Sequence, residues 1–425
     1  MIAVPFIYFS LLTWFFYVRN KQFNLPVYTC LIYAVSSFFA ILVDIFDLRF
    51  PDTVDYDISF FACFIYCALL TLCMIPIQVY ANRIQTIEPV QKTRLLIGLA
   101  YVAGIYGVFF MLMSMSQVVL MLTSDMGEMR ANQYAGEGLD GFMASWPRVI
   151  RLPFSLLNMI FGCPWISIFL AFFCLVIQKL PARYSVMYII GSLLGPISGI
   201  IGADRSNIAY WMLSLAACYV FFRPYMSAAL KRKFIIFASI LVVLFGLYLA
   251  AMTISRFEDR DAGDGRVDGT QGSLISYFGQ SYTNFCYFFD TFETPCPTLE
   301  AIFPFTYNYI LGIGEGGGVP LQQMLTDRTN VFLGVFYTFL GQIATTAGNG
   351  IAIAFSIFFV AFFISYLRRF FISSNTNLLG IYVYMACATV VYLGLFGHYY
   401  TSASNTFSLI SFWIIITIMC YKIKL

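Results

Sequence analysis

The residues best suited to chemistry in this chain lie at the ends of long apolar stretches. In the sequence GADRSN, Asp204 and Arg205 occupy a very short turn between two such stretches. Asp204 or Ser206 can cap the helix that follows, whose free N–H groups and positive dipole end would then lie beside the Arg205 guanidinium. This arrangement predicts an anion site suited to phosphate, although a capped and salt-bridged turn without a ligand fits the same residues.

A second charged cluster, TISRFEDRDAGDGRVDG, directly follows another apolar stretch. If the helix continues for one turn beyond this stretch, Arg256 and Arg260 share a face at i, i+4 spacing and can bind two oxygens of one diphosphate. Arg256 is the stronger candidate because it lies closest to the apolar residues. Arg266 and the acids around it are better explained as a solvated loop.

The only histidine of the chain, His398, lies in the sequence GHYYTSASN at the end of a further apolar stretch. Because an imidazole titrates near neutral pH, His398 can act as a general base. Tyr399, Tyr400, Ser402 and Asn405 offer hydrogen bonds to hydroxyl groups beside it. A lone histidine is more often structural, and that interpretation stays open.

Further carboxylates extend the set of candidate bases. Asp327 and Arg328 form an acid and base pair in LTDRTN, followed by Asn330. Asp290 and Glu293 lie on an aromatic segment upstream. Asp327, Asp290 and Glu293 are therefore plausible carboxylate bases, and Arg328 is a candidate ligand for a diphosphate.

The sequence favours no metal site and no cofactor. One histidine is too few for a histidine-rich zinc site, and no Cys-x-x-Cys motif occurs. Asp52, Asp55 and Asp57 are more typical of a solvated acidic loop than of a cation site. Of the 11 cysteines, only Cys286 and Cys296 lie in an outer loop where a disulfide could form.

Transmembrane helices are the elements that must position these groups. The chain is 60% hydrophobic and 11% charged with a mean hydropathy of +0.81, whereas soluble domains carry about 25% charged residues. A spanning helix needs roughly 20 apolar residues. Eleven stretches meet this requirement, and we predict an all-α integral membrane protein with helices near residues 2–18, 27–46, 58–79, 95–122, 160–178, 184–203, 206–222, 234–255, 347–367, 377–397 and 404–421.

The orientation follows from the lysines and arginines of the short connections, since cytoplasmic loops retain positive charge. With the N-terminus outside and the C-terminus in the cytoplasm, Glu88 is the one acid among the inner loops. The inner basic residues are then Arg19, Lys21, Arg83, Lys92, Arg94, Lys179, Arg183, Arg223, Lys231, Arg232, Lys233, Arg368, Arg369, Lys422 and Lys424. Such a belt contacts anionic lipid, and nothing in it indicates binding of nucleic acid.

We expect one transmembrane domain over residues 1–425, with a smaller outer loop at 124–150 and a large one at 256–346. The segment SLISYFGQSYTNFCYFFDTF has aromatic residues near helical spacing, which predicts a helix lying along the outer membrane face. IFPFTYNYILGIGEGGGVP and NVFLGVFYTFLGQIATTAGNG are apolar but interrupted by Gly, Pro, Asn and Gln. Each is predicted to re-enter the membrane or lie against it, and the number of spans rises to thirteen if both cross.

Glycines recur every four residues in the sixth stretch, at Gly191, Gly195 and Gly199. A row of small residues lets a neighbouring backbone approach closely. We therefore predict close helix packing along this row.

The arginine of GADRSN, the arginine of TISRF and a large outer loop containing YFGQSYTNF resemble the Wzy oligosaccharide repeat-unit polymerases, which make bacterial O-antigen and capsular polysaccharide. The resemblance covers roughly residues 185–405. It implies a membrane glycosyltransferase of the GT-C type in the bacterial inner membrane, acting on the periplasmic side. The donor and acceptor would both be oligosaccharides on undecaprenyl diphosphate, and chain-length regulator and flippase partners are implied as well.

The resemblance and the charged clusters together suggest a metal-independent mechanism. Fixed cations stabilise the diphosphate that leaves, and a base removes the proton of the acceptor hydroxyl. The candidate diphosphate ligands are Arg205, Arg256, Arg260 and Arg328, and the candidate bases are His398, Asp204, Asp290 and Asp327. Candidate contacts to glycan or prenyl chain are Tyr277, Tyr282, Phe285, Tyr399 and Tyr400.

Three other classes of membrane protein fit the sequence less well than a polymerase. A lipopolysaccharide ligase typically has a histidine in the large outer loop, and residues 256–346 contain none. A flippase for lipid-linked sugars should have charges reachable from both faces, whereas most non-cytoplasmic charges here gather at one boundary. A membrane O-acyltransferase needs a histidine near cytoplasmic acyl donors, and His398 is predicted on the other side.

Overall fold

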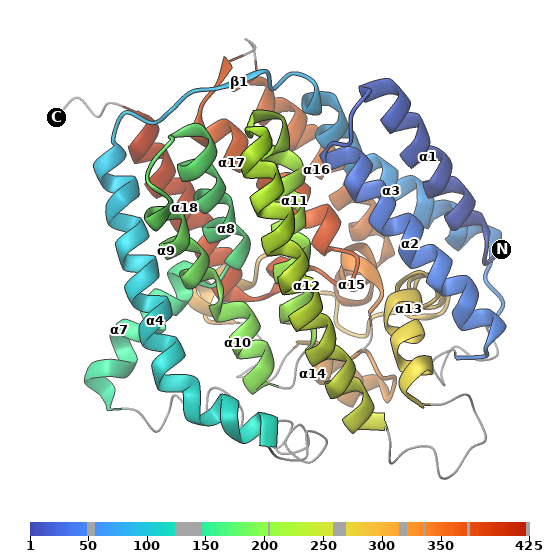
Figure 1. The fold of residues 1–425 in the computed structure, drawn as a ribbon. Helices are drawn as coiled ribbons and strands as arrows, with labels where there is room; N and C mark the ends of the chain where they lie inside the picture. The colour runs from blue at the N-terminus through green and yellow to red at the C-terminus, as the bar shows by residue number, and fades with distance from the viewer. Residues whose placement is uncertain are drawn as a thin grey trace. The chain divides into compact units, whose positions relative to one another are not determined.

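The computed structural model describes residues 1–48, 56–123, 147–202, 205–257, 269–313, 321–334, 336–371 and 375–421. Nearly all of the elements are helices (Figure 1). They divide between two compact units. The first unit comprises Met1–Ile87 and Gln271–Thr406, and the second comprises Glu88–Thr270 and Phe407–Leu425.

The first unit contains the helices that carry His398 and most of the acidic candidates. Its long helices are capped where the sequence allows it: the side chain of Asn24 caps α2, that of Ser59 caps α3 and that of Asn377 caps α17. The elements are α1 (Val4–Asn20), α2 (Leu25–Ile45), α3 (Phe60–Ala81), β1 (Thr86–Ile87), α13 (Gly269–Thr291), η6 (Thr306–Leu311), α14 (Leu321–Thr329), α15 (Thr338–Ala347), α16 (Asn349–Arg368), β2 (Asn375–Thr376), α17 (Leu378–Leu393), η7 (Tyr399–Thr401) and the start of α18 (Ala403–Cys420). The two short strands pair in parallel, with Thr86 opposite Asn375.

The second unit contains the remaining helices. They are α4 (Thr93–Thr123), α7 (Arg148–Phe161), α8 (Pro164–Phe172), η3 (Phe173–Ile177), α9 (Ala182–Ser192), α10 (Leu194–Ile201), α11 (Arg205–Phe222), η4 (Arg223–Tyr225), α12 (Ala228–Phe257) and the rest of α18. The sixth predicted stretch is therefore two helices, α9 and α10, with a break at Leu193. α7 and the helix from Pro164 to Ile177 are bent by 65° relative to each other.

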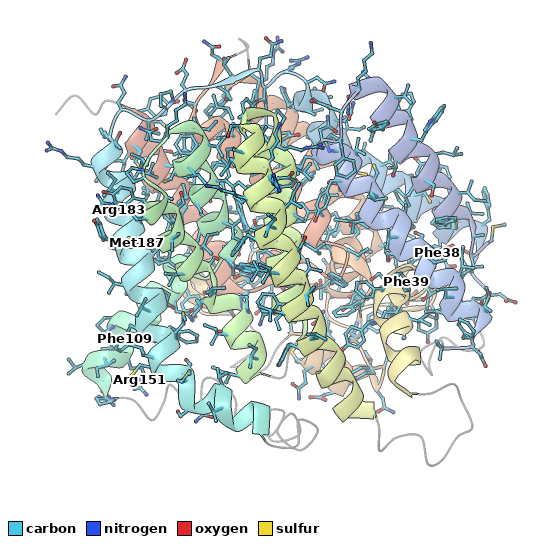
Figure 2. The ribbon with its side chains drawn as sticks, viewed as in Figure 1. Phe38, Phe39, Phe109, Arg151, Arg183 and Met187 are labelled. Atoms are coloured by element: carbon cyan, nitrogen blue, oxygen red, sulfur yellow. The ribbon has the colours of Figure 1, made fainter. Side chains whose placement is uncertain are left out.

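Two glycines of the predicted row, Gly191 of α9 and Gly195 of α10, pack closely against neighbouring helices. A Cβ added at Gly191 would lie 2.8 Å from the carbonyl oxygen of Ala103, and one at Gly195 would lie 2.8 Å from the Pro164 ring. On the facing helix α4, Gly104 lies against Met187, whose side chain is labelled in Figure 2. The close approach of α4 and α9 depends on these missing side chains.

The protein is an all-α membrane protein, and each of the eleven predicted stretches coincides with a helix or helix pair. Six helices of the described residues are long and apolar enough to cross a bilayer, or seven if the bent pair from Arg148 to Ile177 is one span. α1 has 17 residues and α17 has 16, so both are shorter than a typical span of about 20. The count of eleven stays a prediction.

The first unit has two ends with different chemistry. One end, which we call the His398 end, collects the start of α1, the end of α2, the starts of α3 and α16, and α13 and α15. Contacts to α13 support this grouping: Tyr282 donates to the carbonyl of Met1 at 3.4 Å, the Asn349 amide donates to that of Phe289 at 2.7 Å, and the Phe61 ring at the start of α3 lies 6.3 Å from the Phe289 ring. The opposite end, which we call the arginine end, carries Arg19 at the end of α1 and Arg83 just after α3. The two arginines and His398 therefore lie at opposite ends of the unit, as the charge distribution in the sequence predicts.

Candidate functional site

Helix α15 is a short helix at the His398 end in which all ten residues are buried. Ten residues span about 15 Å, which is too short to cross a bilayer. At its start, the N–H of Phe339 donates to the carbonyl of Gly394 at 2.7 Å, just beyond α17. At its end, Gly348 has φ +99°, and the chain turns there into α16. α15 thus brings its polar residues to the end of α17.

Gln342 of α15 fixes the backbone of His398. Its Oε1 accepts a hydrogen bond of 2.6 Å from the His398 N–H. The His398 carbonyl accepts two more bonds from Thr401, at 3.1 Å from the N–H and 2.8 Å from Oγ1. The main chain of His398 is therefore held on both sides, and none of these hydrogen bonds uses the imidazole.

The imidazole of His398 is 6% exposed, and its Nδ1 has no hydrogen-bond partner within the described residues. The rings of Phe355 and Tyr400 lie 6.2 Å from the imidazole, centroid to centroid. Burial lowers the pKa of His398 to about 4. The ring is therefore neutral at pH 7 and is a weaker base than a free imidazole, and a bound anion would raise this pKa.

Asp290, at the end of α13, accepts a hydrogen bond of 2.6 Å from Tyr56 at Oδ2. The same hydroxyl lies 3.2 Å from the carbonyl oxygen of Cys286. Burial and the hydrogen bond to Asp290 raise the pKa of Tyr56, so this phenol remains a donor at neutral pH. Tyr56 thereby orients an exposed carboxylate at the His398 end.

Asp327 and Arg328 lie on α14, and both are exposed. Arg328 Nη1 donates to Cys296 Sγ at 3.1 Å. Cys296 and Cys286 are both free thiols and Cys286 is buried, so the structure does not contain the disulfide considered from the sequence. Arg328 is exposed enough to meet an anion.

Tyr282 and Phe285 of α13 point into the first unit, whereas the sequence predicted that they contact glycan or prenyl chain. Tyr282 and Phe285 are 0% exposed, and both rings pack on Tyr66 of α3, at 4.9 Å and 5.3 Å. Gly279 permits this packing, since an added Cβ would lie 2.6 Å from the backbone of Phe39; Figure 2 labels Phe39 beside α13. The expectation that Tyr282 and Phe285 contact glycan is wrong for this conformation, because neither ring face is accessible.

The other aromatic candidates are more enclosed than the sequence suggested. Tyr399 and Tyr400 are 9% and 5% exposed, so they support the backbone around His398 and present little surface to a sugar. Tyr277 is half-buried against Phe336, with ring centroids 5.2 Å apart. Tyr277 alone keeps accessible ring surface for a glycan.

The arginines of the two helix-end motifs belong to the second unit. Arg205 is the first residue of α11, as its motif predicts, and Arg256 lies in the last turn of α12. The side chains of both residues, together with Asp204 and Arg260, lie outside the described part of the structure. Their role in binding a diphosphate stays a prediction.

Gln342 and Tyr56 are the two contributors that sequence reasoning missed. A signal for Gln342 was present, since an amide interrupts the apolar run FLGQIATTA. Tyr56 had none, because its partner Asp290 is 234 residues away. Within the described ranges, no group of three or more His, Cys, Asp and Glu side chains is placed to hold a metal ion.

No family model matches this chain, and no curated protein or solved structure matches it either.

Proposed function

We propose that this protein is a membrane glycosyltransferase that joins oligosaccharide repeat units carried on undecaprenyl diphosphate, at the periplasmic face of a bacterial inner membrane. The observation that carries the proposal is a pair of groups at one end of the first unit: the exposed carboxylate of Asp290, which Tyr56 orients, and the buried His398, whose Nδ1 has no partner among the described residues. The membrane helices and the resemblance of GADRSN, TISRF and YFGQSYTNF to the Wzy polymerases support the same assignment.

The reaction proposed is a direct transfer of a glycan from one carrier to another. The acceptor hydroxyl attacks the anomeric carbon of the donor glycan and forms the new C–O bond, while the bond to the diphosphate oxygen breaks and its electron pair leaves with the carrier. His398 or Asp290 takes the hydroxyl proton. Arg205 and Arg256 are the residues proposed to stabilise the negative charge that develops on the diphosphate.

The proposal is tested in the source bacterium after deletion of the gene. Cells without the protein should accumulate the carrier with a single repeat unit, and the wild-type gene should restore long glycan. His398→Ala, Arg205→Ala and Arg256→Ala should each insert normally yet fail to restore it. Arg94→Ala, which removes an exposed arginine at the start of α4, is the matched control and should restore it fully.

Purified protein separates this function from transport. Incubated with the accumulated single-unit carrier and EDTA, it should produce glycans of several repeat units, measured by mass spectrometry. If the protein only moves the carrier across vesicle membranes without forming new bonds, it is a flippase instead. Normal glycan ladders from all three variants would overturn the mechanism.

A further inference from the structure

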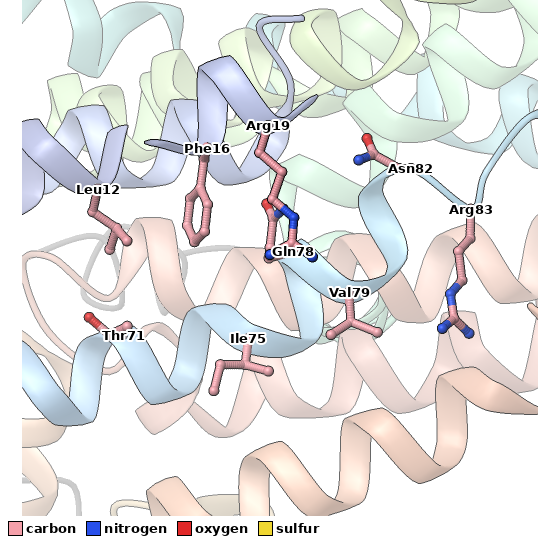
Figure 3. Close-up of a pocket in the computed structure, with 9 residues that line it drawn as sticks. All are labelled: Leu12, Phe16, Arg19, Thr71, Ile75, Gln78, Val79, Asn82 and Arg83. Carbon is pink, nitrogen blue, oxygen red and sulfur yellow. The ribbon is translucent and has the colours of Figure 1, made fainter. Parts of the chain in front are cut away.

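A cavity of about 560 Å³ lies between α1 and α3 toward the arginine end of the first unit (Figure 3). This volume is in the range of about 300–1,000 Å³ that is typical of small-molecule sites. The cavity lies away from His398, and glycan transfer makes no use of it. The described residues that line it are Leu12, Phe16, Arg19, Thr71, Ile75, Gln78, Val79, Asn82 and Arg83.

The two halves of the cavity differ in polarity. Leu12 and Phe16 point from α1 toward α3 (Figure 3), and Ile75 and Val79 of α3 also line the cavity. Ile75 is 37% exposed, so this apolar half is open to the surroundings of the helices. Such a slot suits a hydrocarbon chain, since α3 is one of the helices apolar enough to cross a membrane.

The polar half of the cavity is built around Asn20, which is 9% exposed. Asn20 and Gln78 exchange two hydrogen bonds, each 3.1 Å long. Asn82 Nδ2 donates a third, to Asn20 Oδ1 at 2.8 Å. The amides that face the cavity are therefore held in place before any ligand arrives, which lowers the entropy cost of binding.

Arg19 and Arg83 both line the cavity. Arg19 extends from the last turn of α1 toward Gln78, whereas Arg83 points away from α1 (Figure 3) and its guanidinium stacks on the ring of Tyr80 at 5.3 Å. Neither arginine forms an ion pair with a described residue, and no described residue lining the cavity is acidic. A ligand for this half of the cavity should therefore carry negative charge. Phosphate fits, because guanidinium donors match phosphate oxygens in geometry.

We propose that this cavity binds one anionic phospholipid, with its phosphodiester at Arg19, the positive charge of Arg83 nearby, and an acyl chain in the apolar half. A free phosphate ion would leave the apolar walls unused, and a zwitterionic lipid would bring a cation toward two arginines. The arginine end is also the end predicted to face the cytoplasm, where anionic lipids attract basic residues.

Native mass spectrometry of the full-length protein tests this proposal with phosphatidylglycerol and phosphatidylcholine as competing probes. Wild-type protein should retain one phosphatidylglycerol with a preference of about fivefold or more over phosphatidylcholine. The double variant Arg19→Gln/Arg83→Gln should lose this preference. The control Arg94→Gln/Arg232→Gln removes the same charge from two exposed positions outside the cavity and should keep it.

Two further measurements separate a lipid from other ligands. Ile75→Trp fills the apolar half and leaves both arginines in place, so it should also abolish retention of phosphatidylglycerol. Inorganic phosphate in millimolar excess should not displace the lipid; if it does, the site belongs to a free anion and the proposal fails. Equal retention by wild-type protein and the double arginine variant would overturn it as well.

Discussion

At the residue scale, His398 owes its properties to what surrounds its backbone. Gln342 and Thr401 satisfy its main-chain groups, while apolar and aromatic rings cover its side chain. The environment therefore disfavours the imidazolium and supplies nothing to neutralise it. A charged diphosphate arriving at this end would reverse that preference, so the proton affinity of the site would rise with substrate bound.

The buried imidazole makes the stability of the protein depend on pH. In the unfolded chain the pKa of His398 is near 6.5, and in the folded protein it is about 4. Between these values the unfolded state binds more protons, so the stabilising contribution is complete above pH 6.5 and falls as the pH drops toward 4. The free energy of unfolding should therefore fall by up to about 3 kcal/mol over this pH range, since one pKa unit is worth about 1.4 kcal/mol.

His398→Gln should remove this component of the acid sensitivity. The unfolding midpoint of detergent-solubilised protein would be followed by tryptophan fluorescence between about pH 4.5 and about pH 7. Carboxylates titrate in wild-type and variant alike, so the difference between the two profiles isolates the histidine. Parallel profiles would mean that the ring is already protonated or solvated in the folded state.

The sequence alone pointed to those residues whose possible chemistry follows from their residue type and position. His398 and Arg205 stood out because a charge or an imidazole at the end of an apolar stretch requires a reason. Tyr56 could not be found, because a tyrosine is ordinary near a membrane boundary and its contact with Asp290 exists only once α13 has packed. The burial of Tyr282 was missed for the same reason.

At the element scale, apolar length predicted helices well and predicted their breaks poorly. Every predicted stretch is helical, yet the stretch from 184 to 203 divides at Leu193 and the one from 160 to 178 joins a bent pair. Such breaks cost backbone hydrogen bonds that neighbouring helices must replace, so they depend on tertiary contacts. α13 illustrates the same limit: its aromatic face fits a surface helix, but Gly279 allows it to pack against α2.

The contact between α4 and α9 should be sensitive to one methyl group. A Cβ at Gly107 would lie 2.6 Å from the carbonyl oxygen of Ile190, in backbone that cannot yield easily. Gly107→Ala should therefore destabilise the protein by about 1–3 kcal/mol, as overpacking does elsewhere. Gly98→Ala on the same helix meets nothing within 4 Å and should be neutral or mildly stabilising. Thermal unfolding of both variants tests this prediction. Equal midpoints would show that α4 and α9 are packed less closely than the structure indicates.

The junction of α15 and α16 should depend on a glycine for its backbone conformation. Gly348 has φ +99° and ψ 155°, a region that residues with a side chain rarely adopt, although no atom would block a Cβ there. Gly348→Ala should therefore lower the free energy of unfolding by about 1–3 kcal/mol through backbone strain alone.

The matched variant for this junction is Gly350→Ala, which also has open space around its Cβ and no positive φ. It should leave the thermal midpoint unchanged or raise it slightly. If the protein carrying Gly348→Ala is as stable as the one carrying Gly350→Ala, the turn into α16 is not strained, and α15 is held in place by its other contacts.

At the scale of the whole molecule, the distribution of charge and the arrangement of helices in the first unit agree. Arg19 and Arg83 lie at the end opposite His398, as alternating spans require. The proposed lipid site and the proposed site of glycan transfer would then face different leaflets. Their separation depends on the orientation of the chain in the membrane, which the positive-inside pattern predicts.

The cysteines offer a direct measurement of that orientation. Of the 11 cysteines, only Cys296 and Cys420 are not buried. Cys296 lies beside Arg328 in the loop predicted to be periplasmic, and Cys420 ends α18 on the side predicted to be cytoplasmic. A maleimide that cannot cross the inner membrane should label Cys296 in cells with a permeable outer membrane, and should label Cys420 only after the inner membrane is opened. Cys296→Ser should remove the first signal and Cys420→Ser the second. The reverse order of labelling would invert the topology, and it would place His398 on the cytoplasmic side, where periplasmic glycan transfer could not use it.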